Sequence, residues 1–151
     1  MDGKALGIRL AGLGVANTVA GLGLWKFGRD DATRAFGQQS AMWGLVDLGI
    51  AGVSLLRPAG DDLRIRKVLL INAALDVGYI AGGAHVAHYR SSFGGRVSPQ
   101  AARGHGLAVV VQGAQLLTFD LWHARQLGID TSVVSGRRSA AASRPGVPST
   151  G

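Results

Sequence analysis

The sequence contains no cysteine and no glutamate, and each absence excludes a class of protein. Without cysteine there is no disulfide framework, no thiolate metal site and no cysteine nucleophile. Glutamate is favoured on the exposed faces of water-soluble helices, so its absence argues against an ordinary soluble helical bundle. Charged residues are also scarce, because they make up 17% of the 151 residues, against about 25% in an average soluble domain.

Glycine, apolar residues and positive charge are what the sequence has in abundance. Glycine accounts for 24 residues, 47% of the residues are hydrophobic, and the formal net charge is +7. The length indicates a single domain. The basic residues are scattered along the chain rather than gathered with aromatic residues into one patch, so we expect no nucleic-acid partner.

The 16 Lys and Arg residues all fall outside four long apolar stretches. A helix needs about 20 mostly apolar residues to cross a bilayer core, and a soluble amphipathic helix would carry a charged stripe along one face. We therefore predict an all-α fold, a four-transmembrane-helix bundle formed by residues 1–128, with spans at about 8–27, 36–56, 68–89 and 105–125. The alternative is a soluble all-α bundle, in which nothing would cover four apolar helices. The stretches are Leu10–Trp25, Ala35–Leu56, Val68–Tyr89 and Gly104–Ala124.

The distribution of Lys and Arg also predicts an orientation. More of them flank the N-terminus, the middle loop and the C-terminal tail than the other two connections, so both termini are expected in the cytoplasm. The tail, residues 129–151, is rich in Ser, Arg, Pro and Gly and is predicted to be disordered. The preference for Arg and Ala over Lys and Ile is typical of a GC-rich genome and favours a bacterial inner membrane. A cleaved signal peptide over the first stretch is the alternative for that segment.

Polar side chains inside the apolar stretches are the candidate site. An ionised Asp at the centre of a spanning helix costs about 2.5–3.5 kcal/mol on the insertion scale, so we expect these residues inside the bundle. The stretches contain no Lys or Arg, and neighbouring carboxylates do not all stay ionised without such a partner, so at least one should hold a proton at neutral pH. Their similar depths predict one polar intramembrane layer of Asn17, Asp47, Asn72, Asp76, Gln112 and Asp120.

Two roles for this layer stay open at the level of the sequence. As a structural element, it would join the helices by hydrogen bonds and fix their register. As a functional element, it would form a polar cavity for a proton, a cation or a small polar solute, because ionisable residues inside a membrane are functional candidates by default. We find no nucleophile elbow, phosphate-binding loop or dinucleotide fingerprint in a suitable context, so we expect neither an enzyme nor a cofactor.

Small residues spaced by four, or by eight in the second span, predict where the helices pack. This spacing does not distinguish contact within one chain from contact with a second copy or with another membrane protein, so both remain candidate partners besides the lipid bilayer. Such residues line the first span (Gly12, Ala16 and Ala20), the second (Gly44 and Gly52) and the third (Ala74, Gly78 and Gly82).

Three histidines raise the question of a metal. His85 and His88 lie one turn apart near the outer end of the third span, and His105 begins the fourth span on the same side. Three imidazoles can bind zinc or copper. No recognised motif such as HExxH is present, so we predict no metal site and retain these three residues as the candidates to be tested.

The second and fourth spans share a pattern, since Gln39 precedes Asp47 by the same spacing as Gln112 precedes Asp120. This pattern suggests two duplicated helical hairpins.

The segments FGQQSAMWGLVDLGIAG, LLINAALDVGYIAGG and VVVQGAQLLTFDLW resemble an uncharacterised bacterial family of small four-span integral membrane proteins, a domain of unknown function. The resemblance extends over residues 8–125 and carries Asn72, Asp76, Gln112 and Asp120 as motif positions. It implies no assigned activity, substrate or cofactor. We therefore predict a multi-pass integral membrane protein with a structural or partner-binding role, and a small transporter or channel-like protein is the alternative.

Overall fold

The computed structural model describes residues 3–56, 61–90 and 93–142, and for Gly3 and residues 129–142 it describes the backbone alone. Helices account for almost all of this part of the chain, which contains no strand. The all-α class and the four-helix bundle predicted from the sequence are confirmed. The helices are α1 (Gly3–Phe27), α2 (Asp31–Leu56), α3 (Asp62–Tyr89) and α4 (Pro99–Ala142).

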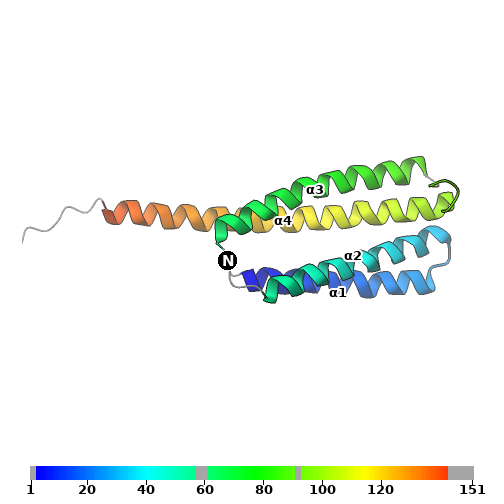
Figure 1. The fold of residues 1–151 in the computed structure, drawn as a ribbon, viewed down its shortest axis with the longest axis horizontal. Coiled ribbons are helices and arrows are strands. Elements are labelled where there is room, and N and C mark those ends of the chain that lie inside the picture. Colours follow the sequence, from blue (N-terminus) through cyan, green and yellow to red (C-terminus); the bar gives the residue numbers. More distant parts are fainter. Residues whose placement is uncertain (1–2, 57–60, 91–92, 143–151) are drawn as a thin grey trace, which may run out of the picture.

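The helices form two antiparallel hairpins that lie side by side (Figure 1). One hairpin is α1 with α2, the other is α3 with α4, and α2 also packs along α4. This arrangement is the one that two helical hairpins would give, while duplication of the sequence itself stays a prediction.

The C-terminal part of α4 differs from expectation. The sequence predicts a disordered tail from Ile129, but α4 continues as a helix to Ala142 and projects beyond the end of the bundle (Figure 1). Between Pro99 and Pro145 the sequence has no proline, so no residue in this stretch removes a backbone donor or forces the helix to end. Residues 143–151, the remainder of the predicted tail, lie outside the described residues.

Short polar side chains start three of the helices. The backbone N–H of Thr33 donates to Oδ1 of Asp30 at 2.8 Å, directly before α2. Asp61 is the N-cap of α3. Oγ of Ser98 accepts from the backbone N–H of Ala101 at 3.1 Å, and the proline that begins α4 stands where a missing N–H costs nothing. These caps satisfy backbone donors that the helices leave unpaired.

Small side chains fill the interior of the bundle, and large apolar side chains cover its outside. Among the described residues, alanine makes up most of the buried hydrophobic positions, with Leu69 and Leu127 as the larger exceptions. Val19, Leu45 and Leu75 are each more than half exposed. Such a surface would be unfavourable in water. In lipid it is expected, because helices there associate through close backbone approach rather than through apolar burial.

Three of the four helices are long and apolar enough to cross a membrane, namely α1 from Lys4, α2 and α3. α4 is not among them, although residues 105–125 form the fourth predicted span. The polar residues Gln112, Gln115, Asp120 and His123 fall in this stretch and lower its hydropathy. That α4 crosses a membrane therefore stays a prediction.

Candidate functional site

Three aspartates, which we call the carboxyl cluster, converge from three helices. Asp47 of α2, Asp76 of α3 and Asp120 of α4 are 1%, 3% and 5% exposed. Their charges are close enough to act on one another: Asp76 acts on Asp47, and both act on Asp120. The structure thus brings together the three carboxyl groups that the sequence places at similar depths.

The register of α3 decides which of its polar residues is inside. The buried residues of this helix are Leu69, Ala73, Asp76 and Gly83, which are separated by four, three and seven residues, as positions along a coiled-coil seam are. Asn72 lies one residue away from this seam and is exposed. The sequence predicts Asn72 in the layer, because residues four apart such as Asn72 and Asp76 share a helix face. The structure corrects this assignment, since the seam passes through the neighbouring alanine.

The carboxyl cluster is not saturated by hydrogen bonds. Oδ2 of Asp47 and Oδ2 of Asp76 are buried and have no hydrogen-bond partner in the described part of the chain. The same is true of Oγ of Ser40 and of Nε1 of Trp43, both on α2. Buried polar atoms are nearly always paired in proteins, so an unpaired group calls for a specific explanation such as a bound water or an exchangeable proton.

A second group, which we call the amide set, is hydrogen-bonded. Nδ2 of Asn17 donates to Oε1 of Gln112 at 2.9 Å and to Oε1 of Gln115 at 3.1 Å. These bonds join α1 to α4 and therefore link the two hairpins. Sequence reasoning did not include Gln115, although its position three residues after Gln112 on a helix already places both on one side.

Glycines spaced by seven make the closest contacts in the first hairpin. A Cβ built on Gly14 would lie 2.8 Å from the carbonyl oxygen of Gly44, and one on Gly37 would lie 2.6 Å from that of Gly21. Both distances are too short for any side chain, so the two backbones touch along this seam. In the second hairpin, a Cβ on Gly83 would lie 2.7 Å from the carbonyl oxygen of its partner on α4.

The small-residue stripes predicted from four-residue spacing do not make these contacts. Built Cβ atoms on the three glycines concerned would meet nothing within 4 Å, and the three alanines are exposed. Of the pair named on the second span, Gly44 lies at the seam, whereas Gly52 has no such neighbour. Residues spaced by seven stay on the seam between two helices that cross with a left-handed twist. Residues spaced by four drift away from that seam and follow the right-handed crossing instead. The residues that face outward are Gly12, Ala16, Ala20, Ala74, Gly78 and Gly82.

The structure does not gather the three candidate histidines. In the described segments, no group of three or more His, Cys, Asp or Glu side chains is arranged to hold a metal ion. His85 and His88 each pack against the ring of Tyr89. His105 instead contacts α2, with its Nδ1 at 3.2 Å from Oε1 of Gln39.

His123 is a buried polar residue that the predicted layer did not include. Its Nδ1 lies 2.7 Å from the carbonyl oxygen of Phe119, and because a carbonyl only accepts, Nδ1 carries the hydrogen. Its Nε2 lies 3.2 Å from Nη1 of Arg9 and accepts from that guanidinium. Both ring nitrogens are thus paired, in contrast to the carboxyl cluster.

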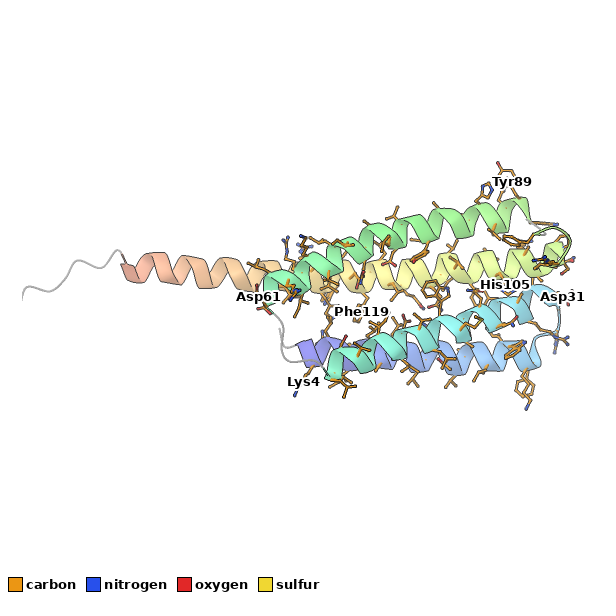
Figure 2. The ribbon with its side chains drawn as sticks, in the orientation of Figure 1. Lys4, Asp31, Asp61, Tyr89, His105 and Phe119 are labelled. Carbon is orange, nitrogen blue, oxygen red and sulfur yellow. The ribbon has the colours of Figure 1, made fainter. Side chains whose placement is uncertain are left out.

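Two open grooves flank the buried layer, and Figure 2 shows one labelled residue of each. The His105 groove, of about 460 Å³, lies between α2, α3 and α4, and its lining includes Gln39, Tyr79 and His105. The His123 groove, of about 760 Å³, lies between α1 and α4, and its lining includes Phe119. In Figure 2, His105 is near the end of the bundle that carries the α3–α4 connection, and Phe119 is nearer the opposite end.

Comparison with known proteins gives one match. A family model matches residues 9–121, and the family is described as a family of unknown function (DUF6992). The chain belongs to the DUF6992 family. No curated protein and no solved structure matches it.

The DUF6992 segment begins in α1 and ends in α4, so it spans both hairpins. It contains the whole carboxyl cluster and the whole amide set, whereas His123 and the projecting end of α4 lie beyond it. The buried layer therefore belongs to the part of the chain that defines the family match. Membership of an uncharacterised family is confirmed, while a bacterial origin and a membrane location stay predictions.

Proposed function

We propose that this DUF6992 protein is an integral membrane protein that crosses the bilayer with all four helices. Three helices have the required length and hydropathy. α4 exposes Val111, Leu121 and Trp122 and keeps its polar residues Gln112 and Asp120 buried, which is how a spanning helix inside a bundle accommodates polar groups. The bias of Lys and Arg favours both termini in the cytoplasm of a bacterium, with the protein in the inner membrane.

Reporter fusions test this topology. Fusions after Arg64 and after Arg138 should report the cytoplasm, and a fusion near Gly95 should report the periplasm. The reversed pattern would overturn the orientation and keep four spans. Reporters near Gly95 and after Arg138 on the same side would show that α4 does not cross.

We further propose that the carboxyl cluster binds exchangeable protons and that the protein is a small proton-coupled transporter or channel. The observation that carries this is the unpaired, buried Oδ2 atoms of Asp47 and Asp76. A carboxyl group that only holds helices together needs hydrogen-bond partners, and these atoms have none in the described chain. A buried carboxylate without a cation beside it is unfavourable, so a proton is the simplest partner that satisfies the group.

A proton fits the cluster better than a metal ion does. A metal ion requires several ligand atoms at fixed distances, and the described His and Asp side chains offer no such arrangement. A proton requires a single oxygen. The cluster therefore supports the choice of a proton over a metal cation as the species bound.

The amide set supports a structural role beside this function. Asn17 bonds two glutamines of α4, and interhelical polar contacts of this kind hold helices together in lipid. In this proposal the amide set has the structural role, and the carboxyl cluster has the functional role. Binding of a second membrane protein remains the alternative if the cluster carries no protons.

Proton uptake into vesicles tests the proposal. The purified protein would be reconstituted into liposomes containing a pH-sensitive dye, with a potassium ionophore to balance charge under an imposed pH difference. We expect uptake faster than in protein-free liposomes, and its loss in Asp47→Asn and in Asp76→Asn, because an amide does not exchange its protons at neutral pH. Asp30→Asn, outside the spans, is the matched control and should keep the uptake.

The same assay has a clear negative outcome. Uptake by the parent protein no faster than in protein-free liposomes would contradict proton transport. Uptake that survives in both Asp variants would show that the cluster is not the site. Melting of each variant in detergent should match that of the parent, since the amide preserves the shape of the side chain.

A further inference from the structure

We propose that a file of bound water connects the His105 groove with the carboxyl cluster, so that water and protons reach the cluster from the end of the bundle that carries the α3–α4 connection. This proposal rests on the proton-binding role proposed above. It assigns the binding of water to Ser40 and Trp43, which belong to neither the carboxyl cluster nor the amide set.

Two contacts show that one side of α2 borders the His105 groove. Gln39 is paired with His105 of α4, and the ring of Trp43 meets the ring of Tyr79 edge-on, with centroids 5.3 Å apart. Gln39, Tyr79 and His105 all line the groove. Trp43 therefore lies directly behind a wall of the groove.

The next turns along the same side lead to the carboxyl cluster. Asp47 follows Trp43 by four residues and Ser40 by seven, so the three share one side of α2. Asp76 precedes Tyr79 by three residues on α3, and its charge acts on Asp47. Each step from the groove to the cluster is thus about one helical turn, or roughly 5 Å.

Every step of this path carries a buried polar atom that lacks a protein partner. These atoms are Oγ of Ser40, Nε1 of Trp43, Oδ2 of Asp47 and Oδ2 of Asp76. The indole N–H only donates, a carboxylate oxygen only accepts, and the hydroxyl does both. Water is the one small molecule that serves all of these, because it donates two hydrogens and accepts two. Buried waters make about three hydrogen bonds to such groups.

A water file would also carry protons. Each water accepts a proton on one side and releases another on the other side, so one proton moves along the file while only O–H bonds form and break. The last water gives its proton to a carboxylate of the cluster, which becomes a neutral acid. No further reactant is needed.

The His123 groove does not offer an equivalent path. The residues that carry the four unpaired atoms line neither groove, but the ring of Trp43 packs against Tyr79, which lines the His105 groove and not the His123 groove. We therefore expect access to the cluster from one end of the bundle.

The absence of cysteine makes a direct test available. Ser40→Cys and Ala41→Cys each introduce a single thiol at adjacent buried positions, 5% and 4% exposed. Ala41 is the matched control because its backbone lies against Gly21 of α1, on the glycine seam rather than on the path. Silver ions, which cross no lipid and are near water in size, would be added to one side of oriented vesicles. Blocked thiols would then be counted with a fluorescent maleimide after denaturation.

We expect silver to block Ser40→Cys from the side of the α3–α4 connection at least about tenfold faster than Ala41→Cys, because a packed seam admits reagent only through local opening. Equal, slow blocking of both thiols would overturn the water file. Faster blocking of Ser40→Cys from the opposite side would overturn its direction.

A second measurement uses the unaltered chain, so its result does not depend on whether the cysteine variants fold. The indole N–H of Trp43, assigned in NMR spectra with Trp43→Phe, should exchange with water far faster than buried backbone amides of α2. Slow exchange would overturn the proposal. If silver reaches Ser40→Cys and proton uptake is absent, the path stands and the proposed function fails. If uptake occurs while silver reaches neither thiol, the function stands and this path fails.

Discussion

In the hairpin of α1 and α2 two glycine pairs bring the backbones together, Gly14 with Gly44 and Gly21 with Gly37, whereas the buried face of α3 in the second hairpin carries a carboxyl group. The second hairpin has such a contact near its connection, and elsewhere its seam includes Asp76. On α2, Gln39 and Trp43 face the second hairpin, where they contact His105 and Tyr79. Of the buried polar layer, the first hairpin supplies Asn17 and Asp47, and the second supplies Asp76, Gln112 and Asp120.

The largest expected effect is at the glycine seam. In Gly21→Ala, the added Cβ would lie 2.6 Å from the carbonyl oxygen of Gly37, so the helices must separate. We expect a loss of about 1–3 kcal/mol of stability, as for other overpacked cores. Gly23→Ala is the control, since a Cβ there meets nothing within 4 Å, and it should gain about 0.5–1 kcal/mol from helix propensity. Thermal unfolding in detergent measures both, and equal behaviour would contradict the seam.

The second hairpin allows the same comparison at adjacent residues. Gly83→Ala should destabilise the protein by about 1–3 kcal/mol, because the added Cβ would lie 2.7 Å from the carbonyl oxygen of Gly106 and 3.0 Å from the backbone nitrogen of Val110. Gly82→Ala should be neutral or slightly stabilising, because that position is open. A larger loss in Gly82→Ala than in Gly83→Ala would instead support the four-residue stripe as a contact with a second copy.

A smaller effect is expected where the two hairpins meet. Asn17→Leu removes both bonds to α4 and should cost between about 0.6 and 1.7 kcal/mol, the range of polar contacts between membrane helices. Asn72→Leu is the control, because Asn72 is exposed and should lose nothing. Detergent melting curves of both variants would show the difference, and a loss in Asn72→Leu as large as in Asn17→Leu would contradict the corrected register of α3.

The smallest effect is at the turn between α1 and α2. Hydrogen bonds from the backbone and side chain of Thr33 hold the pKa of Asp30 below its ordinary value. The stability that this gives is present above the ordinary Asp pKa and is lost as the pH falls through the lowered one. Asn is an equally good cap and does not titrate, so the melting temperature of Asp30→Asn should fall slightly less on acidification than that of the parent. Identical acid profiles would rule out this contribution.

The sequence predicts the fold well because the order of charged and apolar residues along the chain is enough to locate the helices. Lys and Arg fall between the apolar stretches, and the four helices contain all of the predicted spans. The seams are harder to predict, since glycine is frequent on every face of α1 and a spacing of four fits as many residues as a spacing of seven. Asn72 illustrates the limit: it is one residue from the buried Ala73, and sequence spacing does not fix register to a single residue. No sequence pattern indicates that Oγ of Ser40 and Nε1 of Trp43 are buried without a partner, because this depends on the side chains that surround them.

The central claim, that the buried carboxyl groups hold protons, is tested most directly by infrared spectroscopy of the protein at neutral pH. The account predicts the carbonyl-stretch band of a protonated carboxylic acid, shifted in heavy water, reduced in Asp47→Asn and in Asp76→Asn and unchanged in Asp30→Asn. Absence of that band at neutral pH, or a band that both buried variants leave intact, would contradict it.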